Sequence, residues 1–259
     1  MGLNRTFLRG LAPLFAAALF SATPAFAQSD DTQAKPSAEA SAEAGLAAVG
    51  DMATYLGGLT SFEFNASSLF DEPTLNGPAG KRAASYHVAV KRPNKLFLDA
   101  QFDDGSERKV WFDGANVTFA NTTAGTYIEL PFDGDIDGLV TAMEERLGTT
   151  FPLLSFVTST PFSELDEAAI GAEVLGERKL GDDISTVVAV ETIDAYRLFW
   201  IADGSAPLPE RLVTTYLREL GDPEMITTFH RFSEKALPDA TFTAEIADGW
   251  QAIELNPAQ

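Results

Sequence analysis

The feature that most limits the fold of this chain is an alternation of apolar and polar residues that begins near residue 59. In SFEFNASSLF, Phe62, Phe64 and Ala66 occupy alternate positions, with polar residues between them. The same period of two returns in RAASYHVAV, KLFLDAQF, RKVWF, ANVTF and TYIEL, separated by turn signals such as Asp104-Gly105. Because successive side chains of a strand point to opposite faces, the pattern predicts an antiparallel meander with one apolar face.

Segments with helical spacing precede and interrupt these strands. An amphipathic helix is predicted before Gly57-Gly58, with Leu46, Val49, Ala53 and Leu56 on one stripe. A second helix is predicted over 136–147, and 151–160 is apolar nearly all round. Strand patterns then resume, as in STVVAVE and AYRLFWIAD. About 10–11 strands with helices gathered on one face predict an α+β architecture.

The N-terminus has the composition of a secretory signal. Arg5 and Arg9 precede an apolar run that ends in Ala25-Phe26-Ala27, an A-x-A cleavage pattern. Pro13 and Pro24 interrupt the run, which makes it too short to span a membrane comfortably. We therefore expect a cleaved signal peptide at 1–27 and a periplasmic protein without a membrane anchor.

The rest of the chain predicts one domain. Residues 28–43 are polar, small and free of aromatic residues, which is typical of a disordered linker. Residues 44–259 have the length of a single sandwich or barrel. The chain has a formal net charge of −20, which argues against nucleic acid as a partner. It contains no Cys, so neither disulfides nor a lipid-modified Cys anchor is available.

The sequence offers little for catalysis. It has no Cys nucleophile, no G-x-S-x-G elbow and no phosphate-binding glycine loop. Its two histidines, His87 and His230, fall in strand patterns, where a surface role and a structural role are the simpler interpretations. We therefore expect a protein that is not an enzyme and that uses no cofactor.

One segment matches a calcium-loop pattern in full. Residues 133–144 supply D-x-D-x-D-G-x5-E through Asp133, Asp135, Asp137, Gly138 and Glu144. An EF-hand needs a helix on both sides, however, and the preceding TYIELPF has a strand pattern. The alternative is that Asp135 or Asp137 caps the following helix, where an acid favours the helix dipole. We favour the cap and predict no metal site.

Hairpin register decides which aromatic residues face the interior. A three-residue loop at 103–105 pairs Leu98 with Val110 and Phe97 with Trp111, and it keeps apolar and charged residues on separate faces. A two-residue turn at Asp113-Gly114 then pairs Phe112 with Ala115. The predicted inner face is Leu96, Leu98, Val110, Phe112, Ala115, Val117 and Phe119. Trp111 is predicted beside Phe97 on the outer face, as a source of sheet rigidity or a partner surface.

Several segments, taken in order, resemble a family of predicted periplasmic proteins of unknown function within the LolA-like superfamily, which includes lipoprotein carriers. The most specific set is KRPNK at 91–95, WFDG at 111–114 and PLPERLV at 207–213, and the resemblance covers about residues 44–255. It implies a strongly curved, unclosed antiparallel half-barrel with helices over the concave face. In carriers of this superfamily, the covered cavity holds acyl chains.

Together these observations predict a monomer that binds or carries an apolar ligand, such as an acyl chain, lipid or lipoprotein. Helix 136–147 and segment 151–160 would form a lid, with Met52 and Met143 as adaptable contacts. The predicted cavity lining is Phe62, Phe64, Leu96, Leu98, Val110, Phe112, Val117, Phe119, Met143, Leu147 and Leu154. The alternative is an interaction or sensor module of the same fold, with a packed core and a periplasmic protein partner.

Overall fold

The computed structural model describes residues 37–72, 80–147, 153–180 and 183–254, which all belong to the compact unit spanning 36–259. The signal-peptide prediction therefore lies outside the described residues. Helix α1 (Ala38–Gly58) opens the unit, with the Ser37 hydroxyl accepting a hydrogen bond from the Ala40 amide at 3.2 Å. The prediction of a disordered linker over 28–43 is wrong for residues 38–43, which belong to this helix, because Ser37 caps it and residues 38–44 are only Ala, Ser and Glu.

A meander of six strands follows α1: β1 (Ser61–Glu72), β2 (Gly80–Lys91), β3 (Lys95–Phe102), β4 (Glu107–Phe112), β5 (Asn116–Asn121) and β6 (Thr126–Pro131). Three helical segments come next: α2 (Ile136–Leu147), the single 3₁₀ turn η1 (Leu154–Phe156) and α3 (Leu165–Ala168). A second meander is formed by β7 (Ala169–Leu180), β8 (Asp183–Thr192), β9 (Ala195–Ala202), β10 (Pro209–Tyr216) and β11 (Glu224–Ser233). The described chain closes with η2 (Asp239–Phe242) and the short β12 (Gln251–Ala252).

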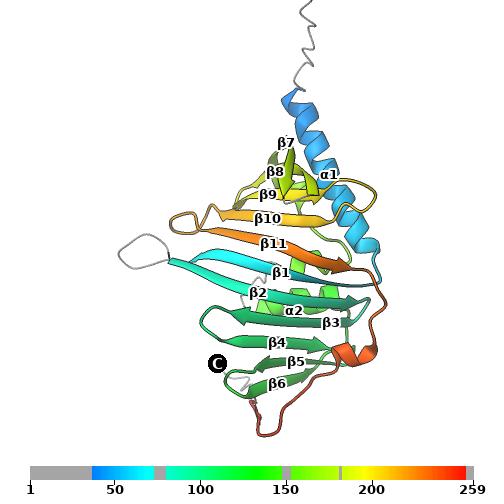
Figure 1. The fold of residues 1–259 in the computed structure, drawn as a ribbon, viewed down its shortest axis with the longest axis vertical. Helices are drawn as coiled ribbons and strands as arrows, with labels where there is room; N and C mark the ends of the chain where they lie inside the picture. Colours follow the sequence, from blue (N-terminus) through cyan, green and yellow to red (C-terminus); the bar gives the residue numbers. More distant parts are fainter. Residues whose placement is uncertain (1–36, 73–79, 148–152, 181–182, 255–259) are drawn as a thin grey trace, which may run out of the picture. The chain divides into compact units, whose positions relative to one another are not determined.

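All of these strands form one sheet, in the order β12-β6-β5-β4-β3-β2-β1-β11-β10-β9-β8-β7 (Figure 1). The two meanders join where β1 pairs with β11, and every neighbouring pair is antiparallel except β12 with β6. The sheet is open, because β12 and β7 end it and do not pair with each other. The predicted α+β half-barrel is confirmed, with the two-residue β12 as a strand too short to be recognised in the sequence.

The registers confirm one hairpin prediction and correct the other. Between β3 and β4, Leu98 pairs with Val110 and Phe97 with Trp111, as predicted. Between β4 and β5 the predicted turn is wrong, because Phe112 pairs with Val117. The Asp113 carboxylate accepts hydrogen bonds from the amides of Ala115 and Asn116, both at 2.8 Å, and so closes a longer loop. Since the shift is by two residues, the inner and outer faces stay as predicted.

One apolar cluster lies on the inner face and joins the sheet to the helices. It includes Val49, Met52 and Leu56 of α1, Ile136, Leu139, Val140 and Met143 of α2, and Leu153, Leu154, Phe156 and Val157 around η1. We use the name cover segment for residues 153–165, which follow α2 and lead to α3. The helices are therefore held on the sheet by side chains that share one core.

The outer face near Trp111 is also covered, which the sequence did not predict. The ring centres of Trp111 and Phe97 are 5.7 Å apart, as expected for neighbours on the outer face, but the Trp111 side chain is only 5% exposed. Phe242, Thr243, Ala244 and Ile246 of the C-terminal segment line a pocket together with Trp111, and the Phe242 side chain is fully buried. Trp111 is therefore not an exposed partner surface, because the chain's own C-terminal segment lies against it.

In the described part of the chain, no helix is long and apolar enough to cross a membrane.

Candidate functional site

The predicted cavity residues gather on the inner face and are almost completely enclosed. All of them except Phe119 and Leu147 are at most 6% exposed and belong to the single apolar cluster. Phe119 is partly buried and packs against this cluster, and the side chain of Leu147 lies outside the described residues. The structure thus brings the predicted residues together as part of a packed interior.

Phenylalanine rings form the centre of this interior. The Phe64 ring stacks on Phe232 at 5.8 Å between centroids and tilts against Phe229 at 5.5 Å. From there the contacts continue to the cover segment, where Phe156 meets Phe229 at 4.7 Å and Phe162 at 4.8 Å. Such edge and offset contacts are the favoured geometries for aromatic pairs. The rings therefore connect the strands directly to the segment that covers them.

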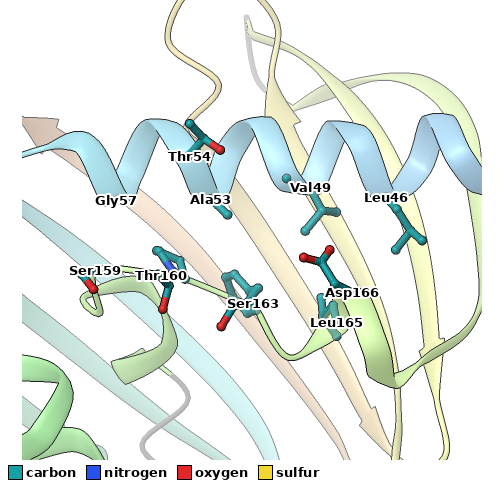
Figure 2. A pocket seen from close by; sticks show the side chains of 13 residues that line it. Leu46, Val49, Ala53, Thr54, Gly57, Ser159, Thr160, Ser163, Leu165 and Asp166 are labelled. Carbon is teal, nitrogen blue, oxygen red and sulfur yellow. The ribbon is translucent and has the colours of Figure 1, made fainter.

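A pocket of about 350 Å³ lies beside this interior, between α1 and residues 159–166 (Figure 2). Leu46, Val49 and Ala53 of α1 line it on one side, and Phe162 and Leu165 line it on the other. Figure 2 shows Leu46 and Val49 pointing from the helix towards the segment that carries Leu165. Because Val49, Phe162 and Leu165 also belong to the apolar cluster, the pocket borders the packed interior.

The polar groups of this pocket are mostly uncharged. Hydroxyl residues Thr54, Ser159, Thr160 and Ser163 line it, together with the single carboxylate of Asp166. Figure 2 shows the Asp166 carboxylate directed towards α1, beside Val49. None of the residues predicted as cavity lining lies in this pocket. The sequence signal for this pocket was the apolar stripe Leu46, Val49 and Ala53. The stripe predicted the helix, but it did not show that residues 159–166 lie opposite.

Helix α1 is positioned by close contacts at both of its ends. Near its start, the Ser41 hydroxyl accepts a hydrogen bond from the Val174 amide of β7 at 3.3 Å. Near its end, a Cβ atom on Gly57 would lie 2.5 Å from the carbonyl oxygen of Ser159. Only glycine permits this approach, so the C-terminal turn of α1 lies directly against the cover segment.

Arg92, between β2 and β3, joins α1 to the cover segment and was missed by the sequence analysis. Its guanidinium donates hydrogen bonds to the carbonyl oxygens of Leu59, Val157 (3.1 Å) and Thr158 (2.6 Å). The guanidinium carbon also lies 5.1 Å from the centre of the Phe62 ring, within the range of a cation–π contact. Burial lowers the pKa of Arg92 from its usual value. The only sequence feature that pointed to this contact was the position of Arg92, directly before Pro93 at the end of a predicted strand.

Asp137 gives the cover segment a second attachment. Its carboxylate accepts hydrogen bonds from the Ser159 amide, at 2.8 Å, and from the Ser159 hydroxyl. Asp135 caps α2, since its carboxylate accepts a hydrogen bond from the Gly138 amide at 2.8 Å. The helix-cap interpretation of segment 133–144 is thus confirmed. Among the described residues, no group of three or more acidic or histidine side chains could hold a metal ion.

Both histidines lie on the outer face, away from this pocket. His87 bonds Glu63 at 3.1 Å, and His230 bonds the Ser67 hydroxyl at 3.1 Å. In the described part of the chain, no carboxylate bonds His230, so the Ser67–His230 pair lacks the third group that orients a catalytic base.

The sequence matches one family model, described as "Predicted periplasmic protein (DUF2092)", over residues 46–256. A search of curated proteins found no match. Among solved structures, lipoprotein LppX of Mycobacterium tuberculosis is similar, with 17% identity over 75% of this chain and 98% of that chain and a TM-score of 0.46. A LolA superfamily protein of Nitrosomonas europaea shows 13% identity over 79% of this chain and 98% of that chain, with a TM-score of 0.41. The MucA/MucB complex of Pseudomonas aeruginosa shows 12% identity over 77% of this chain and 60% of that chain, with a TM-score of 0.42.

Proposed function

The chain belongs to this family of predicted periplasmic proteins, and we propose that it binds an apolar ligand, such as an acyl chain, between helix α1 and the cover segment. The proposal includes export through a signal peptide at 1–27, a linker after it and a single binding domain that reaches 259. The observation that carries it is the pocket of about 350 Å³, which borders the apolar cluster of the inner face. A volume of this size falls within the range of small-molecule sites.

The lining explains how such a ligand would be held. Each methylene group that leaves water for an apolar site contributes about 0.8 kcal/mol, so affinity grows with chain length. Leu46, Val49 and Ala53 provide an apolar wall along α1, and Phe162 and Leu165 provide the facing wall. Hydroxyl groups of Thr160 and Ser163 border the pocket and suit the polar end of the ligand.

A longer ligand requires space inside the packed interior, and the attachments of the cover segment indicate where that space can open. Arg92 donates hydrogen bonds to the carbonyl oxygens of Val157 and Thr158, and Asp137 accepts one from the Ser159 amide, so these two side chains hold residues 157–159. If these bonds are released, movement of the cover segment exposes the inner-face phenylalanines, including the predicted lining residues Phe62 and Phe64. Met52 and Met143 are members of the same cluster and can adapt their shape to a guest.

A pair of variants on α1 tests the proposal. Ala53→Phe places a ring in the pocket, whereas Ala47→Phe adds the same ring to an exposed position of the same helix. We expect Ala53→Phe to weaken binding of a dansyl-labelled fatty acid by about tenfold or more, the loss that corresponds to two methylenes no longer buried. Ala47→Phe should bind like the unmodified protein. Equal binding by both variants, or no binding by the unmodified protein, would refute the proposed site.

A second candidate function is a protein-interaction or sensor module with a permanently packed core. The observation that favours it is the near-complete burial of the predicted lining residues. A module of this kind would not take up the fatty acid, and its interior would resist exchange in the presence of lipid. Hydrogen exchange at residues 153–165 separates the two functions, because only a carrier should show protection that changes when an acyl ligand is added.

A further inference from the structure

We propose that the outer face of the sheet carries a second binding site, for a neutral ligand rich in hydroxyl groups, such as a saccharide unit. The site is a pocket of about 400 Å³ on β11, β1, β2 and β3, and it is separate from the apolar pocket beside α1. Its polar lining includes Asn65, Ser85, His87, Asp99, Gln101 and His230.

The strand registers place these residues in one row. Asn65 on β1 pairs with His230 on β11 and, on its other side, with His87 on β2. His87 in turn pairs with Asp99 on β3. The only two histidines of the chain therefore flank one asparagine on the same face of the sheet. Directly paired residues of neighbouring strands are close enough for their side chains to act on one ligand.

Several polar side chains of this row have no hydrogen-bond partner among the described residues. The amides of Asn65 and Gln101 and the hydroxyl of Ser85 make no side-chain hydrogen bond with another described residue. One carboxylate oxygen of Asp99 is buried and unpartnered within the described chain, while the other lies 3.5 Å from the Lys109 ammonium. A buried acceptor without a donor is costly and rare, so this oxygen is free to accept a hydrogen bond from a ligand.

A β-bulge on β11 borders the same pocket. Glu63 pairs with Ser233 but Asn65 pairs with His230, so β11 has one more residue than β1 in this interval. Arg231, which also lines the pocket, has a φ of 50°, a left-handed conformation that is uncommon outside glycine. Bulges and strained residues of this kind concentrate at binding sites, where they direct side chains that a regular strand could not present.

The charges of the lining favour an uncharged ligand. The pocket contains one guanidinium, Arg231, and one carboxylate, Asp99, while His87 is bonded to the carboxylate of Glu63. An anion would meet the carboxylates, and a cation would meet Arg231. Amide and hydroxyl side chains both donate and accept hydrogen bonds, and the hydroxyl groups of a sugar do the same. The lining therefore matches a polyol better than a phosphate or a carboxylate.

The two histidines allow a direct test on the full mature protein. Because the chain has only two imidazole rings and both line this pocket, each imidazole NMR signal reports on it. We expect at least one of the neutral disaccharides maltose, trehalose and diacetylchitobiose to shift both imidazole signals saturably at neutral pH. Asn65→Ala and Gln101→Ala should each raise the Kd about fivefold, the ratio that corresponds to one hydrogen bond. Gln251→Ala, an exposed glutamine on β12, is the matched control and should leave the Kd unchanged.

Three results would overturn the proposed saccharide site. If none of the three disaccharides shifts the imidazole signals, or if inorganic phosphate alone shifts them, the proposed ligand class is wrong. If a disaccharide binds but Gln101→Ala and Gln251→Ala affect it equally, the pocket is not its site. Retained methyl and amide signals of the inner-face core in the free variants show that the fold is intact. Because fatty-acid binding is measured separately, failure of this test leaves the apolar site unaffected.

Discussion

Phe112 and Trp111 are neighbours in the sequence, yet they belong to two faces of the sheet that are covered in different ways. Phe112 is fully buried on the inner face, in the cluster shared by α1, α2 and the cover segment. Trp111 is buried on the outer face, where the segment 242–246 borders it. The inner cover is attached to strands by an arginine and many apolar contacts, whereas the outer cover is a short stretch near the C-terminus.

This difference shows that burial alone does not distinguish a ligand site from a covered surface. The inner face has aromatic contacts that reach across several elements and a pocket at its border. The outer face is closed over Trp111 but open at the row that contains His87 and His230. Inner-face residues should therefore control global stability, and outer-face residues should control local order and surface binding.

The largest effect is expected for Phe64→Ala on the inner face. Phe64 is 1% exposed and contacts Phe229 and Phe232, so its removal leaves a cavity that costs about 3–5 kcal/mol in the free energy of unfolding. Leu69→Ala, on the same strand but 42% exposed, should cost no more than about 0.5 kcal/mol. Urea denaturation measures both, and similar values for the two variants would contradict the assignment of the core.

A smaller effect is expected for Phe242→Ala on the outer face. Phe242 is fully buried, but the segment that carries it adds only the two-residue strand β12 to the sheet, so we expect it to open without unfolding the other strands. We expect a loss of about 1–3 kcal/mol in the free energy of unfolding, below that of Phe64→Ala. Hydrogen exchange should become faster at residues 239–246 and stay unchanged at residues 62–66. Equal acceleration in both regions would show that the outer cover is part of the main core.

Arg92→Met should loosen the cover segment and lower the free energy of unfolding by as much as Phe242→Ala or less. The variant keeps an apolar side chain near Phe62 but removes the donors to Val157 and Thr158, at a cost of about 1–3 kcal/mol. Hydrogen exchange at residues 157–159 should increase, and uptake of the dansyl-labelled fatty acid should become faster. Arg108→Met, at an exposed arginine, is the matched control and should change neither quantity. Unchanged exchange in Arg92→Met would mean that the arginine does not hold the cover segment.

The smallest effect concerns Asp104, in the turn between β3 and β4. Hydrogen bonds from Ser106 and the nearby Arg82 guanidinium lower the pKa of Asp104 to about 2. Because the pKa is lower in the folded state, this group supports folding above its usual pKa of 3.8, and the support is lost as the pH falls towards 2. Carboxyl NMR titration should show the low pKa in the intact protein and a slightly higher pKa in Arg82→Ala, because the hydrogen bonds from Ser106 remain. A pKa of 3.8 in both proteins would contradict the turn geometry.

Much of the fold follows from the period of two in the sequence. The faces of β3 to β5 were predicted correctly, because a register error of two residues at Asp113 preserves the alternation. The cover of Trp111 could not be predicted, since it depends on a distant segment without a strong period. The role of Arg92 was hidden for the same reason: a single charged residue has no periodicity, and its three carbonyl partners come together only in the folded chain.

The site beside α1 shows the same limit. The apolar stripe of α1 predicted that the helix covers something, but the identity of the facing segment depends on the long connection between β6 and β7. Apolar residues at Phe62 or Leu98 have the same pattern whether they fill a core or line a cavity. The sequence therefore predicted the location of the interior better than its degree of closure.

Native mass spectrometry of the protein purified from its own cell, where we propose that it is exported and cleaved after residue 27, tests the central proposal most directly. If the protein binds an apolar ligand between α1 and the cover segment, the mass should exceed that of the mature chain by the mass of a lipid or fatty acid. The additional mass should disappear in Ala53→Phe and persist in Ala47→Phe. A mass equal to that of the mature chain alone, together with no uptake of the dansyl-labelled fatty acid, would contradict the proposal.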